Sequence, residues 1–446
     1  MNAANDHVRE AVGRDGRPRI LIAGGGYVGM YTALGLERLL DAEEAELYMV
    51  APENFMRYQP LLPEVAAGSV EPRHVVVPLR RVLPRTRVTL GRLSGLDHGR
   101  RTATITLGDG GHGTIGYDVL VLGLGSVTKV MPVPGLVDHA VGFQTLAEAI
   151  HLRNQVLARL EVAESTTDQR VRRRALTFVF VGGGYAGVEA LAELQDLARQ
   201  ACSSYRTIAA HDLRWILIEA TDRILPSVDA RLATHASQVL RARGIELRLE
   251  TQTTSVEDGT VVLSDGERIE ADTLVWMPGV APNPVAAKLG LACDDRGRLI
   301  ADECLRVDGD DAVWTAGDCA AIPDGHGGLH PPTAQHAERE AHHLARNIAA
   351  VLHGQPPTPF RYRTRGEFVT LGDRKAVARI YKAQLHGWPA WLARRAYYVA
   401  RMPTAERRIR LVLDWAAGLP FKRDVSQLGS EQQPDRPLAE AAQEAA

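Results

Sequence analysis

The sequence RILIAGGGYVG, residues 19–29, decides the fold of this chain. Its apolar start predicts a buried parallel strand, and Met30 to Leu40 has helical character. Between them the pattern G-x-G-x-x-G uses glycine in three ways. Gly24 makes the tight turn, Gly26 lets a pyrophosphate approach the backbone, and Gly29 lets helix and strand pack closely. The stretch therefore predicts a dinucleotide-binding unit with phosphates at the helix start.

A second copy of the pattern begins after Ala175, where LTFVFV (176–181) predicts a buried strand and GGGYAG (182–187) follows it. Its glycines are Gly182, Gly184 and Gly187. A strand predicted over 213–218 then ends on Glu219, after a polar insertion around 200–211. A carboxylate in this place accepts hydrogen bonds from the adenosine ribose and repels a 2′-phosphate, so it favours NAD over NADP.

The first unit lacks this acid. Its second strand, predicted over 45–50, ends at Val50-Ala51-Pro52, and the first acid is Glu53. Either Glu53 reaches the ribose or backbone groups hold it. Three strand ends add further candidate cofactor contacts, at Gly125, Gly279 and Asp318.

An internal duplication of a dinucleotide-binding unit implies two nucleotide ligands presented to one another. The simplest pair is a flavin that stays bound and a nicotinamide that comes and goes. We therefore expect an α/β protein with two Rossmann-like domains and a C-terminal α+β region. The predicted parts are 19–145 and 286–358 for FAD, 146–285 for NADH, 359–425 for membrane association, and a disordered tail, 426–446.

Composition excludes several other classes. The chain has 446 residues, 45% hydrophobic and 24% charged, with net charge −2, which gives no reason to expect nucleic acid. Its four cysteines form no C-x-x-C pair, which indicates a reducing compartment. No signal peptide is predicted in Met1 to Pro18, and no apolar run is long enough to span a membrane. His336, His342 and His343 share a predicted helix, but without an H-E-x-x-H pattern we expect no metal.

The C-terminal region has a different character. We expect strands over 360–370 and 375–380 and amphipathic helices over 383–402 and 405–419. From Lys382 to Arg423 nine residues are basic and two acidic, and Trp388, Trp391 and Trp415 lie among them. Such a mixture is typical of an interfacial membrane anchor. A helix that covers the core, or a dimer contact, stays open as an alternative.

The two glycine loops, Y-Q-P-L-L-P (58–63), G-D-C-A (317–320), P-P-T-A-Q (331–335) and the basic aromatic C-terminus together resemble a type II NADH:quinone oxidoreductase. The resemblance implies FAD on Gly24, Gly26, Gly29 and Asp318. It implies NADH on the second loop and Glu219. Glu189 and Gln335 would lie near the flavin ring and a quinone, and Lys375 near the same pocket. It also implies a peripheral enzyme on the cytoplasmic face of the cell membrane, with a homodimer possible.

Two positions depart from the family pattern. Ala51 stands where the family has its ribose acid. A-Q-x-A-x-Q ends here in Arg339 in place of the second glutamine, which affects the electron-acceptor site.

The expected reaction passes hydride from NADH to the flavin and then two electrons to a quinone, without proton pumping. Glu189 could relay a proton, or simply cap its helix. A sulfide:quinone oxidoreductase or disulfide reductase would need paired cysteines that this chain lacks. Two alternatives stay open: a reductase of a protein acceptor such as a ferredoxin, and a low-turnover flavin- and NADH-binding sensor.

Overall fold

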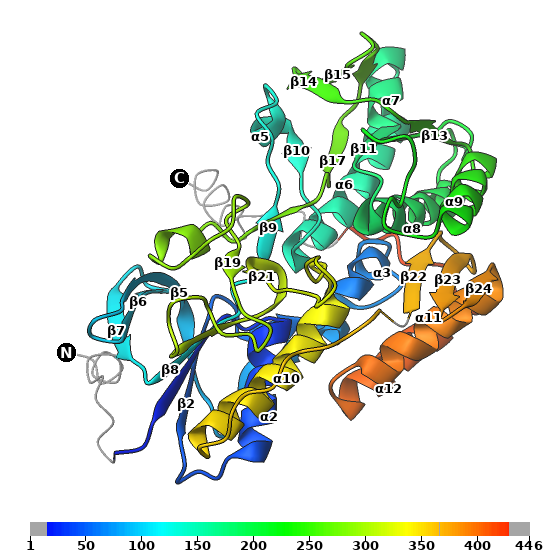
Figure 1. Cartoon of the computed structure of the whole chain (residues 1–446). Coiled ribbons are helices and arrows are strands. Elements are labelled where there is room, and N and C mark those ends of the chain that lie inside the picture. The colour runs from blue at the N-terminus through cyan, green and yellow to red at the C-terminus, as the bar shows by residue number, and fades with distance from the viewer. Residues whose placement is uncertain (1–15, 365, 428–446) are drawn as a thin grey trace, which may run out of the picture. The chain divides into compact units, whose positions relative to one another are not determined.

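The computed structural model describes residues 16–364 and 366–427 (Figure 1). The predictions for the first residues of the chain and for the 426–446 tail therefore fall almost wholly outside the described residues. The chain divides into two compact units. Unit 1 comprises Met1–Pro60, Arg73–Lys129 and Val280–Gly366; unit 2 comprises Leu61–Pro72, Val130–Gly279 and Glu367–Ala446.

Unit 1 is built on a seven-stranded sheet in the order β20-β8-β1-β2-β5-β6-β7. Its first five strands are parallel, and β6 and β7 continue it as an antiparallel hairpin. Every residue of β1 is buried, as expected of a parallel strand covered on both faces. The strands are β1 (Arg19–Ala23), β2 (Glu46–Ala51), β5 (Arg87–Asp97), β6 (Thr102–Leu107), β7 (His112–Gly116), β8 (Val119–Leu122) and β20 (Val313–Thr315).

Two long helices, α2 (Tyr27–Leu39) and α10 (Ala334–Leu352), pack on each other in unit 1. The Thr32 hydroxyl lies 3.4 Å from the Ala341 carbonyl oxygen, and a Cβ on Gly35 would crowd Ala345. The smaller elements are β3 (Phe55–Arg57), η1 (Gln59–Leu61), η2 (Pro72–Val75), β4 (Val76–Pro78), α4 (Leu79–Val82), β9 (Ser126–Thr128), β18 (Val280–Pro282), η4 (Ala286–Lys288), β19 (Leu299–Ile300), η5 (Gly317–Cys319) and β21 (Ala320–Ala321).

Unit 2 contains a five-stranded parallel sheet in the order β10-β17-β11-β12-β13, a second Rossmann-like arrangement. A small antiparallel sheet, β14-β15-β16, follows β13 in the chain. The elements are α3 (Leu62–Ala66), α5 (Leu136–His139), β10 (Ala140–Val141), α6 (Leu146–Ser165), α7 (Gln169–Ala175), β11 (Thr177–Val181), α8 (Tyr185–Ala201), η3 (Cys202–Ser204), β12 (Arg214–Ile218), α9 (Ala230–Ala242), β13 (Ile245–Arg248), β14 (Thr253–Glu257), β15 (Thr260–Leu263), β16 (Arg268–Glu270) and β17 (Thr273–Trp276).

The C-terminal part of unit 2 is a three-stranded sheet followed by two helices. These are β22 (Gly366–Thr370), β23 (Ala376–Ile380), β24 (Ala383–His386), α11 (Trp388–Arg401) and α12 (Ala405–Ala417). The helix expected from Ala383 is wrong at its start, because 383–386 pair with β23 as a strand. Gly387 at φ +69° breaks the chain direction, and α11 begins with Pro389 in its first turn.

β19 covers only Leu299–Ile300, and further along the segment turns at Leu305, which adopts a positive φ. Asp318 lies in the short 3₁₀ turn η5.

Candidate functional site

The first glycine loop has two closed positions and one open position. Gly24 has φ +114°, and a Cβ there would overlap the carbonyl oxygen of Gly123 at the end of β8. A Cβ on Gly29 would overlap the carbonyl oxygen of Gly24. Gly26 has no atom within 4 Å of where its Cβ would stand. The two outer glycines thus permit close packing, and the middle one leaves backbone open to a ligand.

The start of α2 is free of side-chain caps. Its N-cap is Gly26, with no capping hydrogen bond. In contrast, Thr145 and Glu148 form a capping box on α6, and Thr333 caps α10. The first N–H groups of a helix need partners from outside the helix. At α2 they are available to an anion, as expected for a phosphate site.

Asp318 lies in the same unit as the first loop. Among the described side chains only the Ser126 hydroxyl donates to it, at 2.7 Å. Burial raises the pKa of the Asp318 carboxyl, and the Ser126 hydrogen bond opposes this. Gly125, at φ +68°, precedes Ser126 and directs the chain past this carboxylate. Most of the acceptor capacity of Asp318 therefore remains available for the hydroxyl groups of a ligand.

Glu340 supports this turn from α10. It accepts a hydrogen bond from the backbone N–H of Gly317 at 2.7 Å, and burial raises its pKa to about 7. Sequence reasoning did not single out Glu340. The available signal was an acid within the apolar stripe of α10, on the same face as Ala337, Ala341 and Leu344.

Glu53 follows β2 in unit 1, and its side chain is partly exposed. Its carboxylate is 3.6 Å from the guanidinium of Arg57, and its backbone oxygen lies near Gly25. Glu53 is thus next to the first loop, and its role toward a ribose stays a prediction.

The second loop repeats the same geometry in unit 2. Gly182 has φ +109°, and a Cβ there would overlap the Met277 carbonyl oxygen. A Cβ on Gly187 would overlap the carbonyl oxygen of Gly182, whereas Gly184 is open. α8 starts at Gly184 without a side-chain cap. Gly279, at φ +121° and also open, comes two residues after Met277 and lies beside this loop.

Glu219 is tied directly to the second loop. One carboxylate oxygen accepts from the Gly183 N–H at 2.6 Å, and the other accepts from the N–H and hydroxyl of Thr221, each at 2.9 Å. The carboxylate is therefore fixed at the end of β12 beside the glycine loop. This is where an adenosine ribose would be held.

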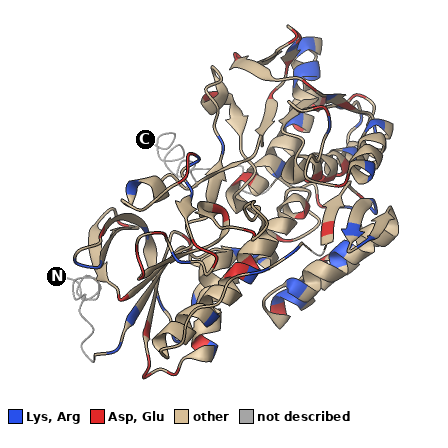
Figure 2. Cartoon of the chain, viewed as in Figure 1, with Lys and Arg blue, Asp and Glu red and all other residues tan. Residues whose placement is uncertain are grey.

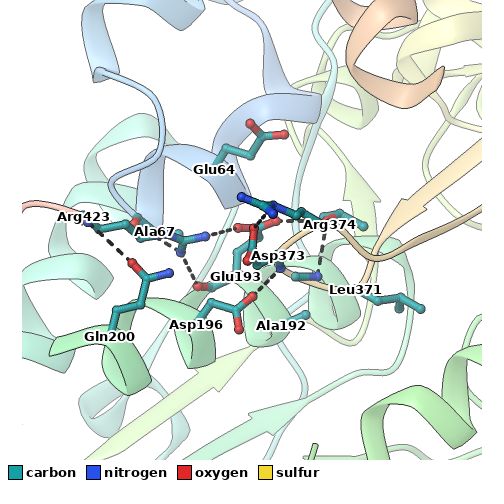
Figure 3. A network of polar contacts seen from close by, with 12 residues as sticks. Glu64, Ala67, Ala192, Glu193, Asp196, Gln200, Leu371, Asp373, Arg374 and Arg423 are labelled. Atoms are coloured by element: carbon teal, nitrogen blue, oxygen red, sulfur yellow. Dashed lines mark hydrogen bonds and ion pairs between the residues drawn. The ribbon is translucent and has the colours of Figure 1, made fainter. Parts of the chain in front are cut away.

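A row of three acids on α8 forms the other polar centre of unit 2. Glu189, Glu193 and Asp196 are spaced four and three residues apart, so they share one face of the helix. Each pairs with an arginine from another segment. The pairs are Glu189 with Arg394 at 3.3 Å and Asp196 with Arg243 at 2.7 Å. The third pair is Glu193 with Arg423 at 3.2 Å (Figure 3).

Glu189 is the most constrained of the three. One carboxylate oxygen accepts from the Thr370 N–H at 2.8 Å and faces Arg394. Burial raises its pKa to about 7, although Arg394 and the Thr370 hydrogen bond lower it. It is too far along α8 to be the capping carboxylate of a helix that starts at Tyr185, and within the described residues its hydrogen bond goes to Thr370 of β22. A carboxyl with this proton affinity can give or take a proton near neutral pH.

Glu64 of α3 completes this cluster. It binds Arg394 at 2.5 Å through one oxygen and the indole N–H of Trp415 at 2.6 Å through the other. Glu64 and Arg394 are 2% and 1% exposed, so the contact is fully buried. Sequence analysis missed Glu64, Arg243, Arg394 and Arg423, because their partners are distant in the chain.

The other predicted acceptor-side residues are divided between the units. Gln335 is the second residue of α10 in unit 1. Lys375 is exposed in the β22–β23 turn of unit 2, and its backbone closes that turn on Gly372 and Leu371. Among the described residues, none binds the Lys375 side chain.

The histidines of α10 are in a mixed aromatic cluster. His336 Nδ1 is 2.8 Å from the Thr333 hydroxyl, and burial, with His330 and Arg339, lowers its pKa to about 4. Arg339 stacks on the ring of Tyr362, with its guanidinium carbon 4.6 Å from the ring centre. Within the described residues no group of three or more His, Cys, Asp or Glu side chains could hold a metal ion.

Comparisons with known proteins agree with this architecture. Residues 18–341 match the family model described as pyridine nucleotide-disulphide oxidoreductase. A type II NADH:quinone oxidoreductase of Mycobacterium tuberculosis is 30% identical over 423 residues, covering 91% of this chain and 87% of that protein. A demethylphylloquinone reductase of Synechocystis is 32% identical over 408 residues, covering 90% and 96%.

The fold is similar to that of NDH2 from Plasmodium falciparum, solved in complex with NADH. The TM-score is 0.86 at 17% sequence identity, over 92% of this chain and all of that one. The chain therefore belongs to the pyridine nucleotide-disulphide oxidoreductase family, in its branch of type II NADH:quinone oxidoreductases.

Proposed function

We propose that this chain is an FAD-dependent enzyme that takes hydride from NADH and passes two electrons to a membrane quinone, without proton pumping. The observation that carries the proposal is the pair of uncapped helix starts, α2 and α8, each behind an open glycine. If the pyrophosphate of a dinucleotide binds at each of these two helix starts, each unit would hold one dinucleotide. The relatives named above support the substrates.

The residues of unit 1 fit FAD. Gly26 leaves open backbone for a pyrophosphate at α2, and Asp318 is a buried carboxylate with acceptor capacity to spare. Gly24, Gly26 and Gly29 would hold the pyrophosphate and Asp318 the ribityl hydroxyls. When bound, the flavin supplies the hydride and electron chemistry.

The second unit would bind and orient NADH. Gly182, Gly184 and Gly187 would take its pyrophosphate, with Gly279 beside them, and Glu219 would accept from its adenosine ribose. On the acceptor side Glu189 would hold the proton that the reduced quinone needs. Gln335 and Lys375 are proposed to contact the quinone.

Stopped-flow absorbance tests the proposal on the flavin-loaded protein. Anaerobic NADH should bleach the flavin band, and a water-soluble quinone should then restore it rapidly. Fast bleaching with slow recovery for every quinone would contradict the quinone assignment and favour a protein acceptor or a sensor. No bleaching by NADH would contradict hydride transfer altogether.

Glu219→Gln should weaken the discrimination between NADH and NADPH. The amide keeps the size of the side chain but removes the negative charge that repels a 2′-phosphate, so kcat/KM for NADPH relative to NADH should rise roughly tenfold. Asp258→Asn, an exposed acid on the β14–β15 turn, is the charge-matched control. An unchanged ratio in Glu219→Gln would show that Glu219 does not face the ribose.

We further propose that α11 and α12 bind the cytoplasmic face of the cell membrane. Figure 2 shows basic residues along both helices. Large apolar side chains are exposed beside them, namely Trp388, Leu392, Ile409, Val412, Leu413, Leu419 and Phe421. This combination suits an anionic lipid surface. Among residues 16–364 and 366–427, none of the helices combines the length with the apolar composition that a membrane span requires.

Replacing Ile409, Leu413 and Phe421 together by Gln should reduce binding to anionic vesicles at least roughly tenfold, since each side chain would lose its apolar burial. Co-sedimentation with vesicles measures this. Val137→Gln, at an 80% exposed position in another part of unit 2, is the control. A shift of the triple variant from dimer to monomer, with vesicle binding unchanged, would assign the surface to a second copy of the chain.

A further inference from the structure

Glu189 interacts with charged and titratable groups of α11, of α3 and of its own helix. Arg394 and Tyr398 face it from α11 and Glu64 from α3, while Glu193 and Tyr185 belong to its own helix. From β22 the backbone N–H of Thr370 binds its carboxylate. Within this group Arg394 is the one cation that lies within 4 Å of Glu189 in the described structure.

The cluster formed by Glu64, Arg394 and Glu189 has two carboxylates and a single guanidinium. Arg394 lies between them, 2.5 Å from Glu64 and 3.3 Å from Glu189, and its guanidinium carbon is 4.8 Å from the centre of the Tyr398 ring. Burial by itself would lower the pKa of Arg394, but Glu189 and Glu64 raise it above the ordinary value. Arg394 therefore stays charged at any working pH, and when both carboxyls are ionised this single guanidinium cannot compensate both negative charges.

Besides Glu189, two side chains define the position of Arg394. Glu64 holds one end of its guanidinium and also binds Trp415 of α12. The Tyr398 ring, one turn along α11, covers its face. A buried guanidinium held in this way cannot rotate away from Glu189 without breaking the Glu64 contact.

We propose that Arg394 is a positioning residue that holds the Glu189 carboxylate against β22 and links it, through Glu64, to α3 and α12. Arg394 fixes the position of the Glu189 carboxylate and lowers its affinity for a proton. Glu64 acts in the opposite direction, as a second negative charge beside Arg394. The C-terminal helices thus act on the proton chemistry as well as on membrane attachment.

The inference rests on the proposed function, in which Glu189 gives a proton to the reduced acceptor. The overall balance is NADH, quinone and one proton giving NAD⁺ and quinol. The hydride of NADH carries both electrons and one proton. The second proton leaves the Glu189 carboxyl for a quinol oxygen, and a proton from solvent restores the carboxyl.

The test is an infrared titration of the flavin-loaded protein, in which each protein is compared with the same protein carrying Glu189→Gln, so that the difference reports the Glu189 carboxyl. In the wild type the midpoint should lie near pH 7. Arg394→Met should move it upward by about one pH unit, a tenfold change in proton affinity. Arg394→Lys should leave the midpoint closer to the wild-type value than Arg394→Met does, since lysine keeps the positive charge but lacks the planar guanidinium.

Glu64→Gln should move the midpoint in the opposite direction, downward, because Glu189 is then the one carboxylate of the cluster that pairs with Arg394. Arg395→Met is the matched control. Arg395 is the next residue on α11 and stacks on Trp391 and Trp415, without an ion pair to Glu189. It should leave the midpoint unchanged. Opposite shifts from Arg394 and Glu64 cannot come from a general loosening of the helix.

Equal midpoints in wild type and folded Arg394→Met would overturn the inference. If Arg394→Met fails to fold, the comparison of Arg394→Lys with Glu64→Gln decides, and shifts of the same sign would overturn it. The proposed function fails separately. If NADH reduces the wild-type protein but no quinone reoxidises it, the proposed quinone acceptor is contradicted. The titration would still test the role of Arg394.

Discussion

Gly184→Val should raise the KM for NADH by about 100-fold in a protein that remains folded and retains its flavin. Gly184 has φ −72°, and nothing lies within 4 Å of where its Cβ would stand, so valine fits without strain. The new side chain would instead occupy the space through which the pyrophosphate approaches the start of α8. Loss of charge-assisted hydrogen bonds worth about 3 kcal/mol corresponds to that factor.

Two other glycines supply the controls for this prediction. Gly26→Val is the equivalent change in unit 1, and it should yield folded protein that loses flavin while its second loop is intact. Gly187→Val should destabilise the fold itself, because its Cβ would overlap the Gly182 carbonyl oxygen. Steady-state kinetics with NADH and thermal unfolding separate these cases. A normal KM in Gly184→Val would show that no phosphate sits at α8.

Glu189→Gln should slow reoxidation of the reduced flavin by quinone by about 10²–10³-fold and leave reduction by NADH unchanged. The amide keeps the contact with Thr370 but has no proton to give, and general acid catalysis contributes a factor of this size. Rapid mixing of the NADH-reduced protein with quinone measures the step. Glu193→Gln, one turn along α8 and equally buried, is the control, because Glu193 binds Arg423 and the Thr370 hydroxyl.

Glu189→Gln should also remove the pH dependence of the quinone step. The pKa of Glu189 is raised to about 7, chiefly by burial, so the carboxyl holds its proton below that pH and loses it above. In the wild type the quinone step should therefore slow as pH rises through 7, while in Glu189→Gln it should be slow and flat. A wild-type rate that increases above pH 7 would mean that Glu189 acts as a base.

The glycine loops illustrate what local sequence can predict. β1 and α2, and likewise β11 and α8, lie where the patterns indicate, since a buried strand, a tight turn and a helix are all encoded within about twenty residues. Glu219 was also predicted, because a strand end places its last side chain at the edge of the sheet beside the loop. These features need only short-range rules.

The C-terminal region shows where such rules end. Residues 383–386 are compatible with a helix by composition, yet they pair with β23, because sheet pairing outweighs local propensity. Local sequence gives no sign that Glu340 and Asp318 are related. The hydrogen bond from the Gly317 N–H to Glu340, which supports the turn of Asp318, forms only because α10 packs beside that turn.

By itself the sequence determined the α/β class, the two glycine loops, the acid at the strand end after the second loop and the basic aromatic character of the C-terminus. Only the tertiary structure decided which charges meet. Glu64 and Arg394 are 330 residues apart, and Glu193 and Arg423 are 230 apart. A single sequence carries no periodic signal for such pairs, because the free energy that selects them comes from burial of charge at a common point, which exists only once the chain has folded.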